Sequence, residues 1–447
     1  MRPQPHRTVV TASCRSPDVA LARCYAAAVA AQPRLCDSTI VDAGARTTQA
    51  SGTIGPMDRR AMRILIAPQE LKGSLAAADA AAAIAAGLRR ALPGAEFDLL
   101  PLADGGPGTL DALLAARGGE ERTVRVCGPL PGVTVTARFA VLPGGTAMIE
   151  TAEANGLALL ARLGLKQEPA HATTRGVGEL IRAALYAGCR RLLLGIGGSA
   201  TNDGGAGMAQ ALGFRLLDAN GEDLQPGAAP LARLARIAAE DADPRLAECA
   251  FEVAVDVQNP LCGPRGATAV YGPQKGVRPE QVAELDAALR RLGEVIARDL
   301  GREVLELPGG GAAGGLGAGL AGFLGARLRP GFAIVADAVD LERHVQAADL
   351  VFSGEGRLDG QTPFGKTIAG LAAVTQRHGK PLVALVGGIA PAFDPASVPG
   401  LTAAFALTAR PLSLDAAQAE ATPLLAALAE QVGRLLAAVR DGEGSSG

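Results

Sequence analysis

From residue 62 onward, short apolar runs alternate with longer amphipathic segments, a pattern typical of alternating strands and helices. The first unit contains a strand at Ile64–Ala67 and an alanine-rich helix at Leu75–Leu92, which ends before Pro93. A second strand at Glu96–Pro101 precedes a helix at Leu110–Ala116. Because units of this kind connect parallel neighbours, the pattern predicts an α/β protein with a largely parallel sheet.

The remainder of the chain continues the alternation, with one exception. Between Thr123 and Ala152 apolar and polar residues alternate between glycine and proline turns, which predicts antiparallel β structure. Further helices are expected at Thr174–Ala187, Pro279–Leu300, 367–378 and 415–439, and further strands at Arg191–Ile196, Phe251–Val257, Leu350–Ser353 and Leu382–Val386. Residues 1–61 lack sustained periodicity and are expected to form a disordered extension, with a transit peptide as the alternative; residues 439–447 are expected to form a disordered tail.

A glycine-rich loop follows the apolar run that ends at Ile196. It contains Gly197, Gly198, Gly204 and Gly205, and the polar residues Ser199, Thr201, Asn202 and Asp203 lie between the two glycine pairs. A strand, a loop of small residues and a helix start present several backbone N–H groups to one anion. A capped turn needs fewer polar side chains than this loop contains, so the loop is predicted to bind phosphate.

Composition excludes several classes of function. The formal net charge is -2 and aromatic residues make up 3% of the chain, which argues against a nucleic-acid partner. No apolar run in the sequence is long enough to cross a bilayer, so no membrane association is expected. The 7 cysteines are dispersed without zinc-ligand spacing, which favours reduced thiols in a cytoplasmic protein. None of these observations excludes a homodimer.

Lysines and acids supply the candidate chemistry. Three of the few lysines stand beside glycine in loop-like sequence, and a lysine ammonium suits phosphate oxygens; these are Lys72, Lys275 and Lys366. Five acids fall in short loops, most of them after predicted strands: Asp104, Asp203, Asp256, Glu355 and Asp359. Phosphoryl transfer needs carboxylates for Mg²⁺, a carboxylate for the hydroxyl and cations on the phosphates. As a set, these residues predict a metal–phosphate site.

Two other motifs are weaker. Residues 360–367 match the P-loop expression GxxxxGK[ST], but the predicted strand ends near Ser353 and Pro363 removes a backbone donor, so a phosphate-adjacent loop is favoured. Residues 309–314 fit GxGxxG, but a poor strand precedes them and close helix packing is favoured. The four histidines lie outside these loops and no GxSxG elbow is present, which disfavours a Ser-His-Asp hydrolase.

The motifs resemble those of the bacterial type-I glycerate kinase family. The strings that carry the resemblance are Leu71-Lys-Gly-Ser74, Leu102-Ala-Asp-Gly-Gly106, Gly195-Ile-Gly-Gly-Ser-Ala-Thr-Asn-Asp-Gly-Gly205, Asn259-Pro-Leu-Cys-Gly263, Gly272-Pro-Gln-Lys-Gly276, Ala312-Ala-Gly-Gly-Leu-Gly317 and Gly354-Glu-Gly-Arg-Leu-Asp-Gly-Gln-Thr362. The resemblance implies phosphorylation of D-glycerate, usually to 2-phosphoglycerate, with ATP and Mg²⁺. It also implies two α/β domains: a discontinuous flavodoxin-like domain (62–146 and 346–438) and a second α/β domain inserted in it (147–345).

Each candidate residue then receives an expected role. Lys72 and Lys275 would bind phosphate or the substrate carboxylate, and Asp104 would orient the substrate hydroxyl. Asp203 and Asp256 would hold Mg²⁺, and Lys72, Asp104 and Asp203 form the expected catalytic set. Phosphate would be cradled by Gly197, Gly198, Ser199, Thr201, Asn202, Gly204 and Gly205. The opposite wall of the cleft would consist of Glu355, Asp359 and Lys366.

Two segments depart from the family pattern. Gln69 and Glu70 stand where the family usually has Asp-Ser, and Pro107 stands where it usually has glutamate. These changes could weaken metal or substrate binding, or shift the preferred hydroxy acid. The alternatives are therefore a kinase for another small hydroxy acid, a weak relative that binds glycerate or nucleotide as a sensor, and a P-loop NTPase that uses Lys366 and Thr367.

Overall fold

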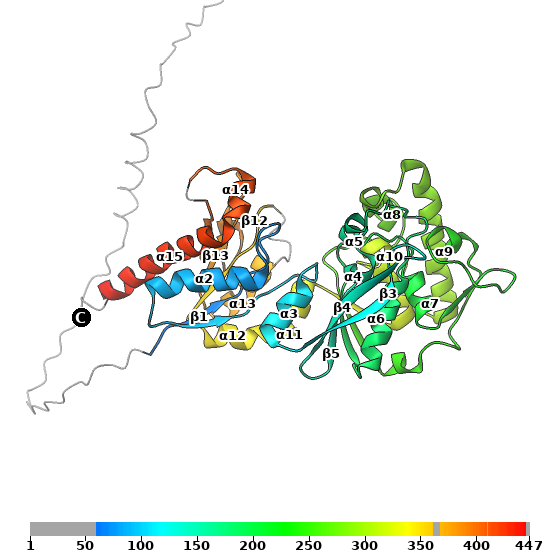
Figure 1. Ribbon diagram of the computed structural model, residues 1–447, viewed down its shortest axis with the longest axis horizontal. Helices are drawn as coiled ribbons and strands as arrows, with labels where there is room; N and C mark the ends of the chain where they lie inside the picture. Colours follow the sequence, from blue (N-terminus) through cyan, green and yellow to red (C-terminus); the bar gives the residue numbers. More distant parts are fainter. Residues whose placement is uncertain (1–59, 361–366, 409, 444–447) are drawn as a thin grey trace, which may run out of the picture. The chain divides into compact units, whose positions relative to one another are not determined.

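The structure is a computed structural model that describes residues 60–360, 367–408 and 410–443 (Figure 1). Its first sheet has five parallel strands in the order β15-β13-β11-β1-β2. Their bounds are β1 Arg63–Ile66, β2 Glu96–Leu99, β11 Leu350–Ser353, β13 Leu382–Val386 and β15 Ala403–Ala406. Counted within this sheet, the strand order from the opposite edge is 2-1-3-4-5, as in flavodoxin-like folds.

Alternating side chains of these strands bury two helical layers. On one face, Ile64 and Phe352 pack under the helices α2 (Ala77–Ala91) and α15 (Ala421–Glu443). These two helices lie side by side (Figure 1). Leu65 and Val351 pack on the other face, in a cluster with Leu110, Phe332, Val345 and Leu371. The helices that accompany this sheet are α2 Ala77–Ala91, α3 Thr109–Arg117, α11 Gly331–Ala338, α12 Leu341–Ala347, α13 Thr367–Arg377, α14 Leu414–Ala419 and α15 Ala421–Glu443. The expected parallel sheet is thus confirmed.

The second sheet is mixed, with six strands in the order β10-β9-β6-β5-β4-β3. Strands β3 to β5 are antiparallel and β5, β6, β9 and β10 are parallel, which confirms the antiparallel prediction for 123–152. The bounds are β3 Glu120–Cys127, β4 Thr134–Leu142, β5 Thr146–Glu150, β6 Arg191–Gly195, β9 Ala250–Ala254 and β10 Arg327–Arg329. Sheet membership therefore changes between β2 and β3, ahead of residue 146, where the sequence suggests the first domain boundary.

Helices cover the second sheet, and two small strand pairs lie outside it. The helices are α4 Ala152–Asn155, α5 Leu157–Arg162, α6 Arg175–Tyr186, α7 Ala206–Ala211, α8 Ala267–Tyr271, α9 Val282–Leu300 and α10 Ala312–Leu324. The 3-10 segments are η2 Ala229–Arg233, η3 Pro244–Glu248, η4 Pro273–Lys275, η5 Pro279–Gln281 and η6 Pro395–Ser397. The small pairs are β7 Arg215–Leu217 with β8 Arg236–Ala238, and β12 Arg357–Leu358 with β14 Gly388–Ile389.

One helix departs from the sequence expectation about bilayer-spanning runs. Within the described residues, Ala421–Arg440 of α15 is long and apolar enough to cross a membrane by length and composition. Its Leu425, Ala429 and Val432 are buried in the cluster that α2 and the first sheet share. The apolar character of α15 is therefore used, at least on this face, for packing inside the fold.

Candidate active site

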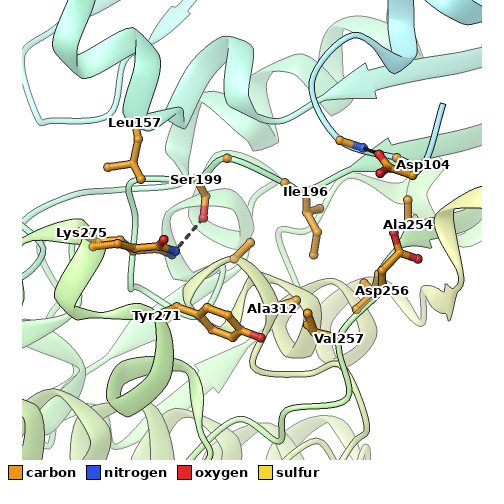
Figure 2. Close-up of a pocket in the computed structure, with 17 residues that line it drawn as sticks. Asp104, Leu157, Ile196, Ser199, Ala254, Asp256, Val257, Tyr271, Lys275 and Ala312 are labelled. Carbon is orange, nitrogen blue, oxygen red and sulfur yellow. Dashed lines mark hydrogen bonds between the residues drawn. The ribbon is translucent and has the colours of Figure 1, made fainter. Parts of the chain in front are cut away.

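A cavity of about 400 Å³ lies at the carboxyl ends of β6 and β9, the edge at which open α/β sheets bind ligands (Figure 2). Its polar lining comes from Asp104, Ser199, Asp256, Tyr271, Gln274 and Lys275. Its apolar lining includes Leu157, Ile196, Val255, Val257 and Ala312. In Figure 2, Asp104 and Asp256 lie toward one end of the drawn pocket, and Ser199 and Lys275 toward the other.

The glycine loop after β6 forms one wall of this cavity. Gly197, Gly198 and Ser199 line it, and Gly198 has φ +75°, in the left-handed region that glycine favours. A Cβ on Gly197 would lie 3.3 Å from the Cα of Gly106, and one on Gly198 would lie 3.4 Å from Cγ of Pro107. Small residues are required here because the loop approaches the Asp104 segment closely.

The second half of the loop faces neighbouring elements instead of the cavity. Thr201 and Asn202 are fully buried; Asn155 Nδ2 donates to Thr201 Oγ1 at 3.2 Å, and Asn202 Nδ2 donates to Thr268 Oγ1 at 3.0 Å. A Cβ on Gly204 would lie 2.5 Å from Leu292, and one on Gly205 would lie 3.2 Å from Gly319. These four positions support the loop through contacts with neighbouring elements, and their expected contacts with phosphate stay a prediction.

Asp203, which is expected to act in metal binding and catalysis, bonds to neighbouring protein groups. It is fully buried, it does not line the cavity, and its carboxylate accepts hydrogen bonds from the backbone and hydroxyl of Thr174 and from the N–H groups of Gly205 and Gly207. Burial raises the pKa of this carboxyl, while the bonds from Thr174, Gly207 and Gly205 act to lower it. The carboxylate ties the loop to the start of α6, and its expected role in metal binding and catalysis stays a prediction.

Lys275 is the buried cation of the site. Its side chain is 2% exposed, and its Nζ donates to Ser199 Oγ at 2.9 Å and to the Thr201 carbonyl at 2.7 Å. Burial lowers the pKa of Lys275 to about 7, against the opposing influence of the Asp203 charge. An ammonium in this position lies against the cavity and has a third N–H beyond the two that bond Ser199 and Thr201.

Asp104 and Asp256 bring two carboxylates to the same cavity from the ends of β2 and β9. Asp104 Oδ1 accepts the N–H of Gly106 at 3.1 Å, and Asp256 Oδ1 accepts the N–H of Gly331 at 2.8 Å. Within residues 60–360, 367–408 and 410–443, no group of three or more His, Cys, Asp or Glu side chains could hold a metal ion alone. A divalent cation at this pair would take further oxygen ligands from a bound substrate or water.

Gly331, the first residue of α11, fixes the Asp104 loop. A Cβ on Gly331 would lie 1.7 Å from the carbonyl oxygen of Asp104. Gly331→Ala is therefore expected to displace Asp104 and to lower kcat about tenfold or more, because small misplacements of reacting groups are costly. Gly94→Ala, at a glycine with open space around it, is the matched control and should change neither kcat nor the melting temperature. Unchanged kcat in Gly331→Ala would show that the loop tolerates this displacement.

Lys72 does not line the main cavity, but its charge and that of Asp104 both act on Glu70. It is exposed, and its charge lowers the pKa of Glu70, whereas burial, the largest influence, and the charge of Asp104 raise it. A second cavity of about 70 Å³ is lined by Gln69, Glu70, Asp104 and Pro107. The residues at which this chain departs from the family pattern are thus gathered beside Asp104.

The expected opposite wall is not part of the main cavity as described. Glu355 is buried and its carbonyl accepts the N–H of Gly387 at 3.0 Å, while Asp359 is half-buried just after β12. Neither residue lines the 400 Å³ cavity. Lys366 lies outside the described residues, so its expected role stays a prediction.

Neither glycine motif that suggested another nucleotide fold has the required setting. Strand β11 of the first sheet ends at Ser353, and between it and Gly360 there is only the two-residue strand β12. No strand of the first sheet therefore leads directly into the P-loop match. In the GxGxxG match, a Cβ on Gly314 would lie 2.0 Å from the Thr201 carbonyl, which confirms close packing. Ala313, at φ 55° in the same turn, lines the main cavity.

Two functional candidates were not predicted individually from the sequence. Tyr271 lines the cavity, and its hydroxyl donates to Asn259 Oδ1 at 2.7 Å; Gln274 lines the cavity one residue before Lys275. Both stand in or beside the Gly272–Gly276 string, so the motif itself was the available signal. Glu150, discussed below, gave no such signal.

Comparisons with known proteins agree on one relationship. Residues 64–437 match the model of the glycerate kinase family. A glycerate kinase from Halalkalibacterium halodurans is 46% identical over 378 residues, which cover 84% of this chain and 97% of that protein. The glycerate 2-kinase of Escherichia coli K12 is 44% identical over 357 residues, which cover 80% of this chain and 93% of that protein.

A solved structure gives the same result for the fold. The crystal structure of a candidate glycerate kinase 2 from Salmonella typhimurium LT2 superposes with a TM-score of 0.78 at 46% sequence identity. The match covers 85% of this chain and 100% of that one. The mixed α/β architecture with parallel strands is therefore shared along the matched length.

Proposed function

Since the chain belongs to the glycerate kinase family, we propose that it transfers the γ-phosphoryl group of ATP to D-glycerate in the presence of Mg²⁺, giving 2-phosphoglycerate. The observation that carries this proposal is the convergence of Asp104, Asp256 and Lys275 on one cavity. The reaction needs two kinds of charge in one place, and this cavity has carboxylates toward one end and a buried ammonium toward the other. Organic-acid catabolism in the cytoplasm is the setting that we propose for it.

The residues that line the cavity are suited to binding ATP. Leu157, Val255 and Val257 supply apolar contacts of the kind that surround a purine, and Tyr271 adds an aromatic ring. The Gly197–Ser199 segment and Lys275 supply the cationic and small-residue wall that a polyphosphate requires. We place the phosphates along this wall.

The carboxylate of Asp256 suits Mg²⁺. It offers hard oxygen ligands, and Mg²⁺ in kinases is commonly bound through one or two carboxylates together with substrate phosphates. When bound, the ion would neutralise charge on the phosphate oxygens. The chain's own part is to hold this carboxylate through Gly331 and the carboxylate of Asp104 through Gly106.

The remaining roles follow from the balance of the reaction. The glycerate hydroxyl oxygen forms a bond to the γ-phosphorus, the bond from that phosphorus to the bridging oxygen breaks, and ADP leaves with the bonding electrons. The hydroxyl proton needs an acceptor, and we assign Asp104 to it. Lys72, beyond Asp104, is assigned to the glycerate carboxylate, with Glu355, Asp359 and Lys366 as the proposed substrate side.

One observation favours a second candidate. Gln69, Glu70 and Pro107 surround Asp104, so they could reshape the substrate side and leave a protein that binds glycerate or nucleotide with little turnover. Calorimetry distinguishes the two: binding of either ligand without ADP release would select the sensor. The same titration with other small hydroxy acids tests a shifted substrate preference.

The test is ADP release coupled to a reporter, with D-glycerate, ATP and Mg²⁺, and phosphorus NMR of the product to distinguish the 2- and 3-phosphate isomers. Asp256→Asn is expected to lower kcat about 10²-fold, because it removes the carboxylate charge that would hold Mg²⁺ beside the phosphates. Asp79→Asn, an exposed acid on α2, is the matched control and should behave as the wild type. Equal turnover in all three proteins would remove Asp256 from the site.

A further inference from the structure

Glu150 caps a helix that is distant from it in the sequence. Its side chain is 6% exposed at the end of β5, and its Oε1 accepts the N–H of Leu110, in the first turn of α3, at 2.6 Å. The backbone N–H of Gly108 also acts to lower the pKa of this carboxyl. Gly108 occupies the N-cap position with φ 92° and has no side chain to cap the helix. The carboxylate of Glu150 therefore replaces a local cap.

The row of sheet residues that contains Glu150 also contacts the Asp104 loop. In the second sheet Glu150 is paired with Gly195, and Gly195 with Ala254, so the three residues form one row across β5, β6 and β9. A Cβ on Gly195 would lie 2.5 Å from the Gly105 carbonyl, and one on Gly105 would lie 2.2 Å from Ala254. The row thus contacts the Asp104–Leu110 segment at its loop and at its helix.

The charge of Glu150 is costly for the fold. The pKa of Glu150 is raised to about 6. Burial is the largest cause, and the charges of Asp111 on α3 and Glu153 on α4 also raise the pKa, whereas the N–H groups of Leu110 and Gly108 lower it. Arg138 of β4 pairs with both of these neighbouring acids at 3.1 Å. Between the unfolded value and about 6 the folded state binds more protons, so the stability contributed by this group falls as pH rises.

We propose that Glu150 is a positioning residue of the phosphoryl transfer: its carboxylate fixes the first turn of α3 and thereby sets where Asp104 faces the cavity. This inference rests on the role assigned to Asp104 under the proposed function. It explains why an ionised group is held at a buried position where a neutral residue would favour folding. Glu150 touches neither cavity itself and acts through the loop.

The first test is Glu150→Gln, which keeps the size of the side chain and removes its charge. We expect kcat with D-glycerate to fall about tenfold, KM for ATP to stay within twofold, and the melting temperature at pH 7.5 to be equal or higher. In the wild type, kcat should decline as pH falls through about 6, and this decline should be absent in Glu150→Gln. Glu150→Asp, which keeps the charge with a shorter reach, should recover part of kcat.

The matched control is Glu179→Gln, because Glu179 also accepts a backbone N–H, that of Cys127, at 2.6 Å, but away from the cavity. It should leave kcat and its pH dependence unchanged. Hydrogen exchange of residues 104–112 should be faster in Glu150→Gln, and this readout needs no substrate, so it remains decisive if the wild type shows no turnover and the proposed function fails. Unchanged exchange and kcat in Glu150→Gln, or a large loss of melting temperature, would overturn the proposal.

Discussion

Lys275→Met is expected to lower kcat/KM for ATP by about 10²- to 10³-fold, because it removes the one buried cation that lines the main cavity in the described part of the chain. Methionine keeps the apolar stem. The melting temperature should change little, since the cost of burying an ammonium disappears together with its bonds to Ser199 and Thr201. The measurement is steady-state kinetics with differential scanning calorimetry.

The pH dependence of the wild type checks the same assignment. Because the pKa of Lys275 in the free protein is lowered to about 7, the ammonium is lost as pH rises, and kcat/KM should fall above about pH 7. Between about pH 7 and the pKa of this lysine in the unfolded chain, the unfolded chain binds one more proton than the folded protein. The free energy of unfolding of the free protein should therefore rise with pH over this interval. Lys166→Met, at an exposed lysine, should retain the wild-type profile. A profile unaltered by Lys275→Met would exclude the ammonium from the reaction.

Asp203→Ala is expected to destabilise the fold by about 4 kcal/mol, because three backbone N–H groups and one hydroxyl lose a buried acceptor. Urea unfolding followed by circular dichroism measures the change. Asp218→Ala is the matched control: Asp218 also accepts two backbone N–H groups, from Asn220 and Glu222, but is half-buried at the surface, and its removal should cost much less. An Asp203→Ala protein with wild-type unfolding and no activity would return Asp203 to the catalytic set.

The sequence predicted the strand-loop-helix setting of the site better than the direction of its side chains. Apolar runs locate β6 and β9, and the α/β pattern places their ends at one edge, which is why Asp256 and Ser199 were found. The sequence pattern of a polar residue in a glycine loop is the same whether its side chain faces a ligand or a neighbouring helix. The sequence therefore predicts that Asp203 faces a ligand, whereas the hydrogen bonds that its carboxylate accepts from Thr174, just before α6, and from Gly207 of α7 depend on tertiary packing.

Long-range capping was also beyond the reach of the pattern. Glu150 ends a strand whose alternation was predicted correctly, but its partner is the N–H of Leu110, forty residues earlier. Likewise, alternation identified β3 and β4 as antiparallel strands without showing which sheet they join. Hydrophobic periodicity encodes which face is buried, and contacts between distant segments depend on the assembled fold.

The first sheet has a consequence for how the chain assembles during synthesis. Its central pair joins Ile64 to Leu350, so β1 leaves the ribosome long before the strand that must lie beside it. All six strands of the second sheet are translated within that interval, from β3 to β6 and then β9 and β10. We therefore expect the β1–β2 pair to have an open edge until the late strands are made, and we expect the five-stranded sheet to complete its folding last.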